Sequence, residues 1–164
     1  MGVIAYIGLG ANLGDPVEQI VNARKRISEF EGTNYTRSSS LYHSSPVGYS
    51  DQPMFTNCVV ELSFNLDCRD LFMQMQNLET CLGRKRDPDN QNGPRFIDID
   101  LLLFGDSVVE DEDLVVPHPR MHERLFVLLP LQELNAKLAK TVSNNRLAEP
   151  ERYFPGQSLV KLAI

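Results

Sequence analysis

The spacing of hydrophobic residues predicts two amphipathic helices in the first half of the chain. The first helix begins after Asp15, which can cap it, has Pro16 at its first position and ends at Gly32. The second begins after Asp67 and ends at Gly83. In both helices the apolar residues lie three or four positions apart. They are Ile20, Ala23, Ile27 and Phe30 in the first helix and Leu71, Met75, Leu78 and Leu82 in the second.

Other segments have the composition or the alternation of β-strands. They are residues 3–9, 34–43, 55–64 and 96–104. With the two helices they give the order β-α-β-β-α-β, which predicts an α+β protein with a ferredoxin-like core, an antiparallel sheet with helices packed on one face. C-terminal additions should follow: a hairpin or short strands at 107–116, a turn at 117–119, an apolar helix at 124–135 and a tail. No linker or repeat divides the chain, so we expect residues 1–164 to form a single domain.

The last predicted core strand carries an Asp-x-Asp pattern. Strand side chains alternate between the two faces, so Asp98 and Asp100 should share one face. Two carboxylates in this position can bind Mg²⁺. An edge strand with a solvated acidic face is the alternative, and it is common. The apolar residues of the segment are expected on the opposite face: Ile97, Ile99, Leu101 and Leu103.

Arginines on both sides of this strand favour a phosphate-binding role. Arg84, Arg86 and Arg95 lie in the polar loop before it, and residues 117–124 add further cationic donors after it. A planar guanidinium can bind a phosphate through two parallel hydrogen bonds. Carboxylates that hold Mg²⁺ and arginines that neutralise a transferring phosphoryl group are the parts that phosphoryl transfer requires.

The net charge, the apolar runs and the cysteines of the chain indicate which partners and which cellular compartment to expect. A formal net charge of −6 argues against a nucleic-acid-binding surface. No apolar run approaches the ~20 residues of a membrane span. The three cysteines are too widely spaced for a zinc site, and their odd number argues against a disulfide framework. We therefore expect a cytoplasmic protein that binds a small polyanion, with no nucleic-acid or membrane partner.

Two further patterns are similar to known functional motifs, a dinucleotide-binding loop and a zinc site, but each departs from the motif. Gly8, Gly10 and Gly14 approach the dinucleotide-binding motif, but its third glycine would fall at Leu13, so we interpret these glycines as easing a tight strand-to-helix turn. His118 and His122 have the spacing of a helical zinc site. Prolines on both sides of His118 argue against a helix there.

Taken together, the motifs resemble 6-hydroxymethyl-7,8-dihydropterin pyrophosphokinase. The most specific part is Gly93-Pro94-Arg95-x-x-Asp98-x-Asp100, and the resemblance extends to Gly83-Arg84-x-Arg86 and to Val116-Pro117-His118. It implies an enzyme of folate biosynthesis that transfers diphosphate from ATP to a pterin alcohol and releases AMP. We expect ATP and the dihydropterin to be its small-molecule substrates and the enzyme to be a monomer.

The resemblance also implies the roles of individual residues. Asp98 and Asp100 would hold two Mg²⁺ ions that bridge the ATP phosphates. Arg84 and Arg95 would be catalytic and would also contact the nucleotide. The other nucleotide contacts would be Gln76, Glu79, Arg86, His118 and Arg124. The pterin would stack between Phe55 and Phe126, and its remaining contacts would be Asn57 and backbone groups of Ser45, Pro46, Val47 and Gly48.

Three positions depart from the family pattern. Asn92 replaces a common Trp, Phe55 replaces a common Tyr, and Asp113 stands where a basic residue often contacts the nucleotide. The residues alone also leave two other classes of protein open. A ferredoxin-like ligand-binding or regulatory module would have the same fold without the reaction, and a metal-dependent nucleotidyltransferase or nuclease would share the paired aspartates.

Overall fold

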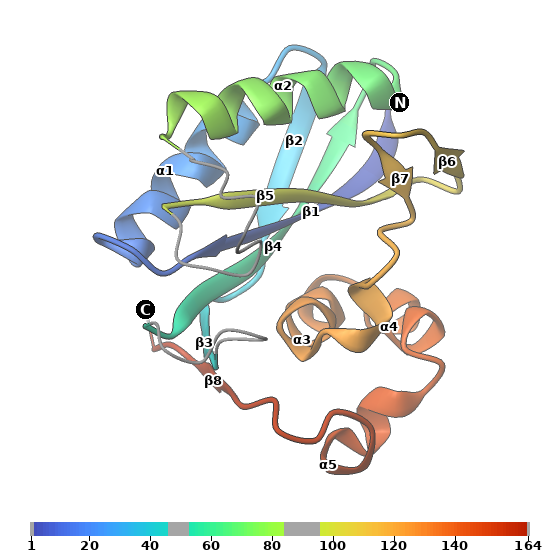
Figure 1. Ribbon diagram of the computed structural model, residues 1–164. Coiled ribbons are helices and arrows are strands. Elements are labelled where there is room, and N and C mark those ends of the chain that lie inside the picture. The colour runs from blue at the N-terminus through green and yellow to red at the C-terminus, as the bar shows by residue number, and fades with distance from the viewer. Residues whose placement is uncertain (1, 46–52, 84–95, 164) are drawn as a thin grey trace.

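The computed structural model describes residues 2–45, 53–83 and 96–163. Figure 1 shows a twisted sheet with helices on both sides. The sheet is antiparallel, with the strand order β5-β1-β4-β3-β8, and β2 pairs with the remaining part of β4. Its strands are β1 (Val3–Ala11), β2 (Thr33–Ser38), β3 (Tyr42–Ser44), β4 (Phe55–Phe64), β5 (Asp98–Phe104) and β8 (Leu159–Lys161).

Two helices cover one face of this sheet, α1 (Pro16–Ser28) and α2 (Cys68–Cys81). Both predicted caps are present: Asp15 accepts a hydrogen bond from the Glu18 N–H at 3.1 Å, and Asp67 accepts one from the Asp70 N–H at 2.9 Å. The order β1-α1-β2-β4-α2-β5 confirms the predicted ferredoxin-like α+β core. The first helix ends four residues before Gly32, which instead occupies the turn into β2 with a φ of +94°.

The opposite face is covered by helices from the C-terminal third of the chain. They are α3 (Leu125–Leu134), preceded by the short helix η1 (Met121–Glu123), and α4 (Ala136–Val142). The hairpin of β6 (Val109–Glu110) and β7 (Val115–Val116) links β5 to these helices. None of the helices in the described ranges is long and apolar enough to cross a membrane.

The last segment is more ordered than the tail that the sequence predicts. It forms η2 (Arg146–Ala148), α5 (Pro150–Tyr153) and β8, and β8 pairs with β3 at the edge of the sheet. The segment is anchored by Phe154, which is 3% exposed and belongs to a cluster with Leu125 and Leu128 of α3. Elements this short lack the periodicity that identifies helices and strands in a sequence.

A bulge interrupts β5. Ile7 of β1 pairs with Leu101 but Tyr6 pairs with Leu103, so Leu102 is an extra residue in β5. Ile99 and Leu101 face the α1–α2 layer, as alternation predicts. The prediction for Leu103 was wrong, because the bulge reverses the alternation and places this side chain in the cluster under α3.

Candidate active site

Three neighbouring strands bring Asp98, Gly10 and Asn57 into one row. In the observed register Gly10 of β1 lies opposite Asp98 of β5 on one side and opposite Asn57 of β4 on the other. Directly opposite residues of antiparallel strands project from the same face of the sheet. Because neighbouring strands are ~4.8 Å apart, the backbones of Asp98 and Asn57 are about 10 Å apart. The row therefore has a carboxylate at one end and an amide at the other, and the Asn57 side chain lies over the glycine between them.

A second row of the sheet also has a glycine at its centre. Gly8 lies between Asp100 of β5 and Val59 of β4. The turn interpretation was therefore wrong for Gly8 and Gly10, because β1 continues to Ala11 and both glycines lie inside the strand. A Cβ on Gly10 would lie 2.9 Å from the Asn57 amide nitrogen, which is closer than non-bonded contacts allow. Of the three glycines, Gly14 fits the turn interpretation, with a φ of +65°.

The two aspartates lie on the face that carries α3, opposite α1 and α2. Both are half-buried at the start of β5, an outer strand of the sheet. Glu79 on α2 is 8% exposed and accepts a hydrogen bond from the Ile99 N–H at 2.7 Å. Since Ile99 separates the two aspartates, this buried carboxylate fixes the segment of β5 that holds them. Gln76, one helical turn before Glu79 on α2, is half-buried.

His118 approaches the aspartates from the segment after β7. Its backbone N–H donates to the carbonyl of the bulge residue Leu102 at 2.9 Å, and its Nδ1 accepts from the Arg120 N–H at 3.1 Å. Burial, followed by the charge of Arg124, lowers the pKa of His118 to about 4, and the charge of Asp98 opposes this shift. The imidazole is therefore neutral at neutral pH. Because Nδ1 is an acceptor, the proton is on Nε2, which can donate to an anion.

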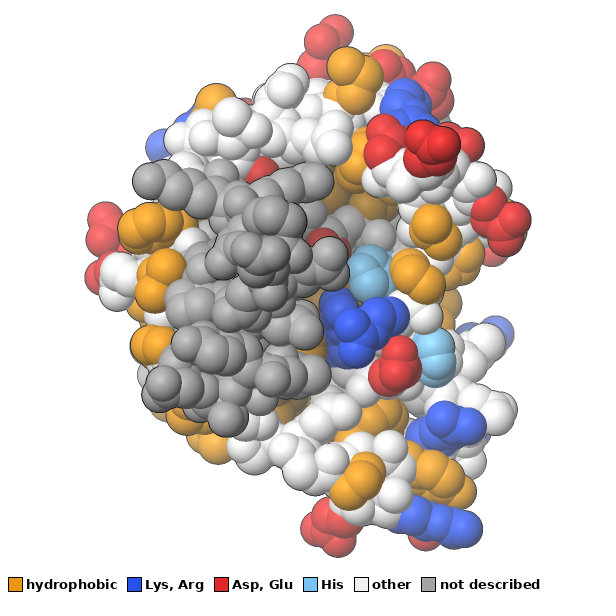
Figure 2. Space-filling view, in the orientation of Figure 1, with side chains coloured by type: hydrophobic (Ala, Val, Ile, Leu, Met, Phe, Trp, Pro, Cys, Tyr) orange, Lys and Arg blue, Asp and Glu red, His pale blue; other side chains and the backbone are white. Residues whose placement is uncertain are grey.

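Arg124 brings a cation to the same place from the junction of η1 and α3. Burial lowers the pKa of its guanidinium, whereas the charges of Asp100 and Asp98 act in the opposite direction. The guanidinium also lies over the ring of Phe126, 5.6 Å from its centroid. Figure 2 shows basic and histidine side chains gathered in a hollow on this face of the molecule. Cationic and acidic groups therefore face one another across the site, as binding of a metal–phosphate complex requires.

Asn57 and Phe55, two of the pterin contacts that the resemblance implies, lie on β4, which is separated from the aspartates on β5 by β1. Asn57 is 5% exposed, and its Oδ1 accepts a hydrogen bond from the Ser44 hydroxyl, which leaves Nδ2 toward Gly10. Phe55 shares a strand face with Asn57, and Phe126 is in α3, which covers that face. Ser44 is a site residue that the sequence did not identify, because its role depends on the pairing of β3 with β4.

Some of the expected site residues lie outside the described ranges. They are Arg84, Arg86, Arg95, Pro46, Val47 and Gly48. Ser45 is described and half-buried, and its N–H donates to the Ser158 carbonyl at 3.3 Å.

Asp113, the acidic residue at a position where a basic one is common, forms an ion pair with Arg69. The Nη1 atom of Arg69, in the first turn of α2, lies 2.9 Å from both carboxylate oxygens of Asp113, and Nη2 contacts Asp111. The guanidinium of Arg69 also lies over the Phe72 ring. The negative charge at position 113 is thus paired within the protein.

The donor set suits a hard metal ion that binds together with a nucleotide. Within the described ranges no group of three or more His, Cys, Asp or Glu side chains is placed to hold a metal by itself. Mg²⁺ does not require such a group, because it is usually held by one or two carboxylates, substrate phosphates and water. Asp98 and Asp100 fit that pattern of ligands, with cationic donors beside them to bind the phosphates.

Comparisons with known proteins agree with this chemistry. Relatives named 2-amino-4-hydroxy-6-hydroxymethyldihydropteridine pyrophosphokinase include one from Bacillus subtilis, 42% identical over 88% of this chain and 85% of the relative. Another from Haemophilus influenzae is 36% identical over 98% of both chains. A crystal structure of HPPK-DHPS in complex with substrates matches 92% of this chain with a TM-score of 0.67 at 12% identity, and the chain spans 44% of its length. The family model of 7,8-dihydro-6-hydroxymethylpterin-pyrophosphokinase matches residues 6–136, and the chain belongs to this family.

Proposed function

We propose that the chain transfers diphosphate from ATP to the hydroxymethyl group of 6-hydroxymethyl-7,8-dihydropterin, in folate biosynthesis. The pterin oxygen forms a bond to the β-phosphorus, the bond from that phosphorus to the bridging α–β oxygen breaks, and AMP leaves. Family membership supports the reaction. The structural observation that carries it is the row of Asp98, Gly10 and Asn57, because it places a carboxylate for the metal and an amide for the pterin on one face of the sheet, separated by β1.

We assign the metal to Asp98 and Asp100, which would hold two Mg²⁺ ions with the ATP phosphates. Bound Mg²⁺ would neutralise charge on the phosphates and align the transferring group. The support is the shared face of the two carboxylates and the backbone hydrogen bond from Ile99 to Glu79 that fixes their strand. Glu79 therefore has a positioning role in addition to any contact with the nucleotide.

Each of the hydrogen-bond donors near the aspartates would have its own role in binding the phosphates. Neutral His118 would donate from Nε2 to a phosphate oxygen, and Arg124 would neutralise charge on the same group. Arg84 and Arg95 would stabilise the charge that develops during transfer, with Arg86 and Gln76 as further nucleotide contacts. The support for these last roles is the match of their positions to the family motif.

The pterin would bind beside Asn57, on the side of β1 opposite the two aspartates. Its ring would stack between Phe55 and Phe126, and the Asn57 amide would bind its polar edge, with backbone groups of residues 45–48 completing the pocket. The Ser44 hydroxyl supports this role, because it determines which atom of the Asn57 amide faces the ligand. A ring system with donors and acceptors on one edge needs such a fixed amide.

We also propose that residues 1–164 act as one domain, as a monomer, in the cytoplasm. The free cysteines Cys58, Cys68 and Cys81 suit a reducing compartment. Light scattering coupled to size-exclusion chromatography tests the monomer, because a mass of 18.5 kDa is expected and twice that mass contradicts it.

The reaction is tested by incubating the protein with ATP, Mg²⁺ and the hydroxymethyl-dihydropterin and separating the nucleotides by chromatography. We expect AMP to appear only when all three components are present. The rival ligand-binding module yields no nucleotide product, and an ordinary kinase yields ADP. Either outcome would refute the assignment.

A further inference from the structure

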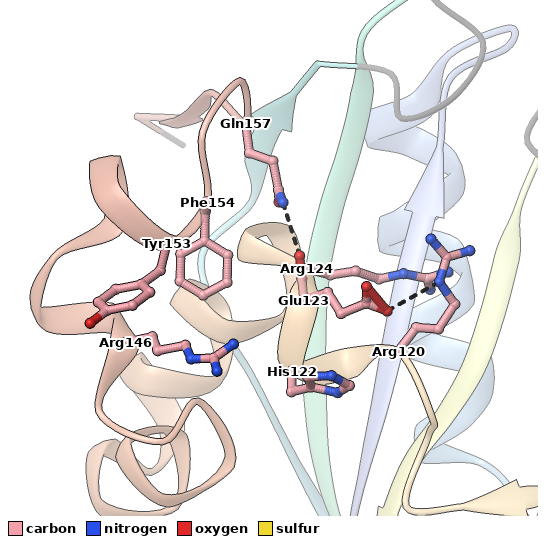
Figure 3. Close-up of a pocket in the computed structure, with 8 residues that line it drawn as sticks. All are labelled: Arg120, His122, Glu123, Arg124, Arg146, Tyr153, Phe154 and Gln157. Carbon is pink, nitrogen blue, oxygen red and sulfur yellow. Dashed lines mark hydrogen bonds and ion pairs between the residues drawn. The ribbon is translucent and has the colours of Figure 1, made fainter.

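A cavity of about 430 Å³ lies between η1 and the C-terminal segment that contains α5. Its volume falls in the range of small-molecule sites, roughly 300–1,000 Å³. Figure 3 shows Arg120 and Arg124 on one side of the cavity and Arg146 and Tyr153 on the other. Three guanidinium groups, two from the ends of η1 and one from η2, thus line one cavity.

The charges around this cavity are unbalanced. Glu123 is its only acidic lining residue among those described, and its carboxylate lies 3.5 Å from Nε of Arg120. Arg146 makes no ion pair within the described ranges, and its contact is with the ring of Tyr153, 5.6 Å from the centroid. Like charges gathered in a concave surface repel one another and favour entry of an anion. The cavity therefore has an excess of positive charge, although the whole chain has a net charge of −6.

The cavity adjoins the site that contains the aspartates but is distinct from it. Arg124 is common to both: the charges of Asp100 and Asp98 act on its guanidinium, and it also lines the cavity. Arg146 and Tyr153 belong to η2 and α5, and neither has a role in the diphosphate transfer described above. A ligand bound to Arg146 would therefore lie beyond the phosphate-binding groups of that reaction.

Internal contacts fix the walls of the cavity. The Gln157 side chain donates from Nε2 to the Glu123 carbonyl at 2.9 Å and accepts from the Leu125 N–H at 2.8 Å. Phe154, which is almost fully buried, packs on Leu125 and Leu128. The C-terminal segment is thereby attached to the junction of η1 and α3 at two points, so the two walls of the cavity are held together before any ligand binds.

We propose that this cavity is a second phosphoanion site, which binds a small phosphate-bearing anion that is not the reacting ATP. Guanidinium groups on opposite walls can each form charge-assisted hydrogen bonds to phosphate oxygens. A group with two phosphates offers more oxygens for such contacts than a single phosphate does. The anion has two possible sources, free diphosphate or the phosphate of a nucleotide product, and its recognition by Arg120 and Arg146 would be the same.

The test is a calorimetric titration of the full chain with inorganic diphosphate and, separately, with AMP, in the absence of Mg²⁺. Arg146→Gln removes the cation that has no ion pair within the described ranges. Arg152→Gln is the matched control, because Arg152 also lies over the Tyr153 ring but pairs with Glu149 and does not line the cavity. We expect Arg146→Gln to weaken binding about tenfold, the effect of losing one charged hydrogen bond, and Arg152→Gln to leave it unchanged.

A second titration, with Mg²⁺ and a non-hydrolysable ATP analogue, separates the two sites. Both variants should bind the analogue as the wild type does, and both should unfold at the wild-type temperature. Tighter binding of AMP than of diphosphate, with the same loss in Arg146→Gln, supports the site and identifies a nucleotide source. No binding of either anion, equal weakening by Arg152→Gln, or an equal loss of analogue affinity in Arg146→Gln would overturn the proposal. Failure to form AMP in the enzyme assay would refute the proposed function and leave this result unaffected.

Discussion

The Asp98 carboxylate and the Asn57 amide lie two strands apart on one face of the sheet, with only Gly10 between them. Strand spacing thus fixes the separation of a metal-binding group and a ligand-binding group without any loop between them. Glu79 secures one side of this arrangement through the Ile99 N–H, and Ser44 secures the other through the Asn57 amide. The site is built on the sheet, and the rigidity of the sheet determines its geometry.

Gly10→Ala should damage binding of the pterin more than binding of ATP. The added Cβ would lie 2.9 Å from the Asn57 amide nitrogen, so this side chain must move away from the position in which it would bind the pterin. We expect the pterin Kd to rise about tenfold, the effect of one displaced hydrogen-bonding group. Gly8→Ala is the matched control, because its Cβ would meet Leu102 at an ordinary distance of 3.5 Å. Equal effects of the two substitutions would show that the space beside Asn57 is not what matters.

Asp98→Asn and Asp100→Asn should each lower kcat by at least about 100-fold at saturating Mg²⁺ while the protein stays folded. Both side chains are half-buried on the site face, and neither belongs to the apolar clusters to which β5 contributes its hydrophobic residues. Steady-state turnover and far-UV circular dichroism measure the two properties. Asp106→Asn, at an exposed position just after β5, should retain wild-type turnover. A near-normal rate in either site variant would remove the metal assignment.

Glu79→Ala should reduce both stability and turnover, and Glu79→Gln should restore the stability. The alanine variant leaves the buried Ile99 N–H without its acceptor, which costs about 1–3 kcal/mol, whereas the glutamine oxygen can still accept this hydrogen bond. Urea unfolding measures the free energy, and kcat measures the alignment of the two aspartates. If the glutamine variant is as unstable as the alanine variant, the carboxylate charge matters rather than the hydrogen bond to β5.

His118 should make the protein less stable in mildly acidic solution. Its pKa is about 4 in the folded state against an ordinary value of 6.5, so the unfolded chain binds more protons between these values. The free energy of unfolding therefore falls as the pH is lowered from about 6.5 toward 4. Urea unfolding across this range should show a smaller decrease for His118→Gln than for the wild type. His122→Gln, at an exposed position, should follow the wild type. Equal slopes for the wild type and His118→Gln would contradict the account.

The sequence predicted the parts of the fold that local interactions determine. Asp15 and Asp67 cap their helices as expected, because a cap depends on the residues of a single turn. The reversed orientation of Leu103 was not predictable, since a bulge arises from pairing with a distant strand. The same holds for β8, which pairs with the distant strand β3 after Phe154 has packed against α3.

Some residues of the site could likewise be predicted from the sequence, and others could not. Alternation alone placed Asp98 and Asp100 on one face, and the roles of His118 and Arg124 were expected from the family resemblance. The function of Gly10 is not visible in the sequence, because it follows from the register of β1 with two partners. Arg146 belongs to no motif and reaches its cavity only through the path of the C-terminal segment.

The central claim is that diphosphate moves as a unit, and a single turnover with ATP labelled at the β-phosphorus tests it directly. Attack at the β-phosphorus transfers this label to the pterin and leaves AMP unlabelled. We expect the β-label in the pterin product in an amount equal to the AMP formed, and no transfer by Asp98→Asn on the same time scale. A label that remains with the nucleotide, as ADP, while the pterin is phosphorylated would contradict the claim and identify an ordinary kinase.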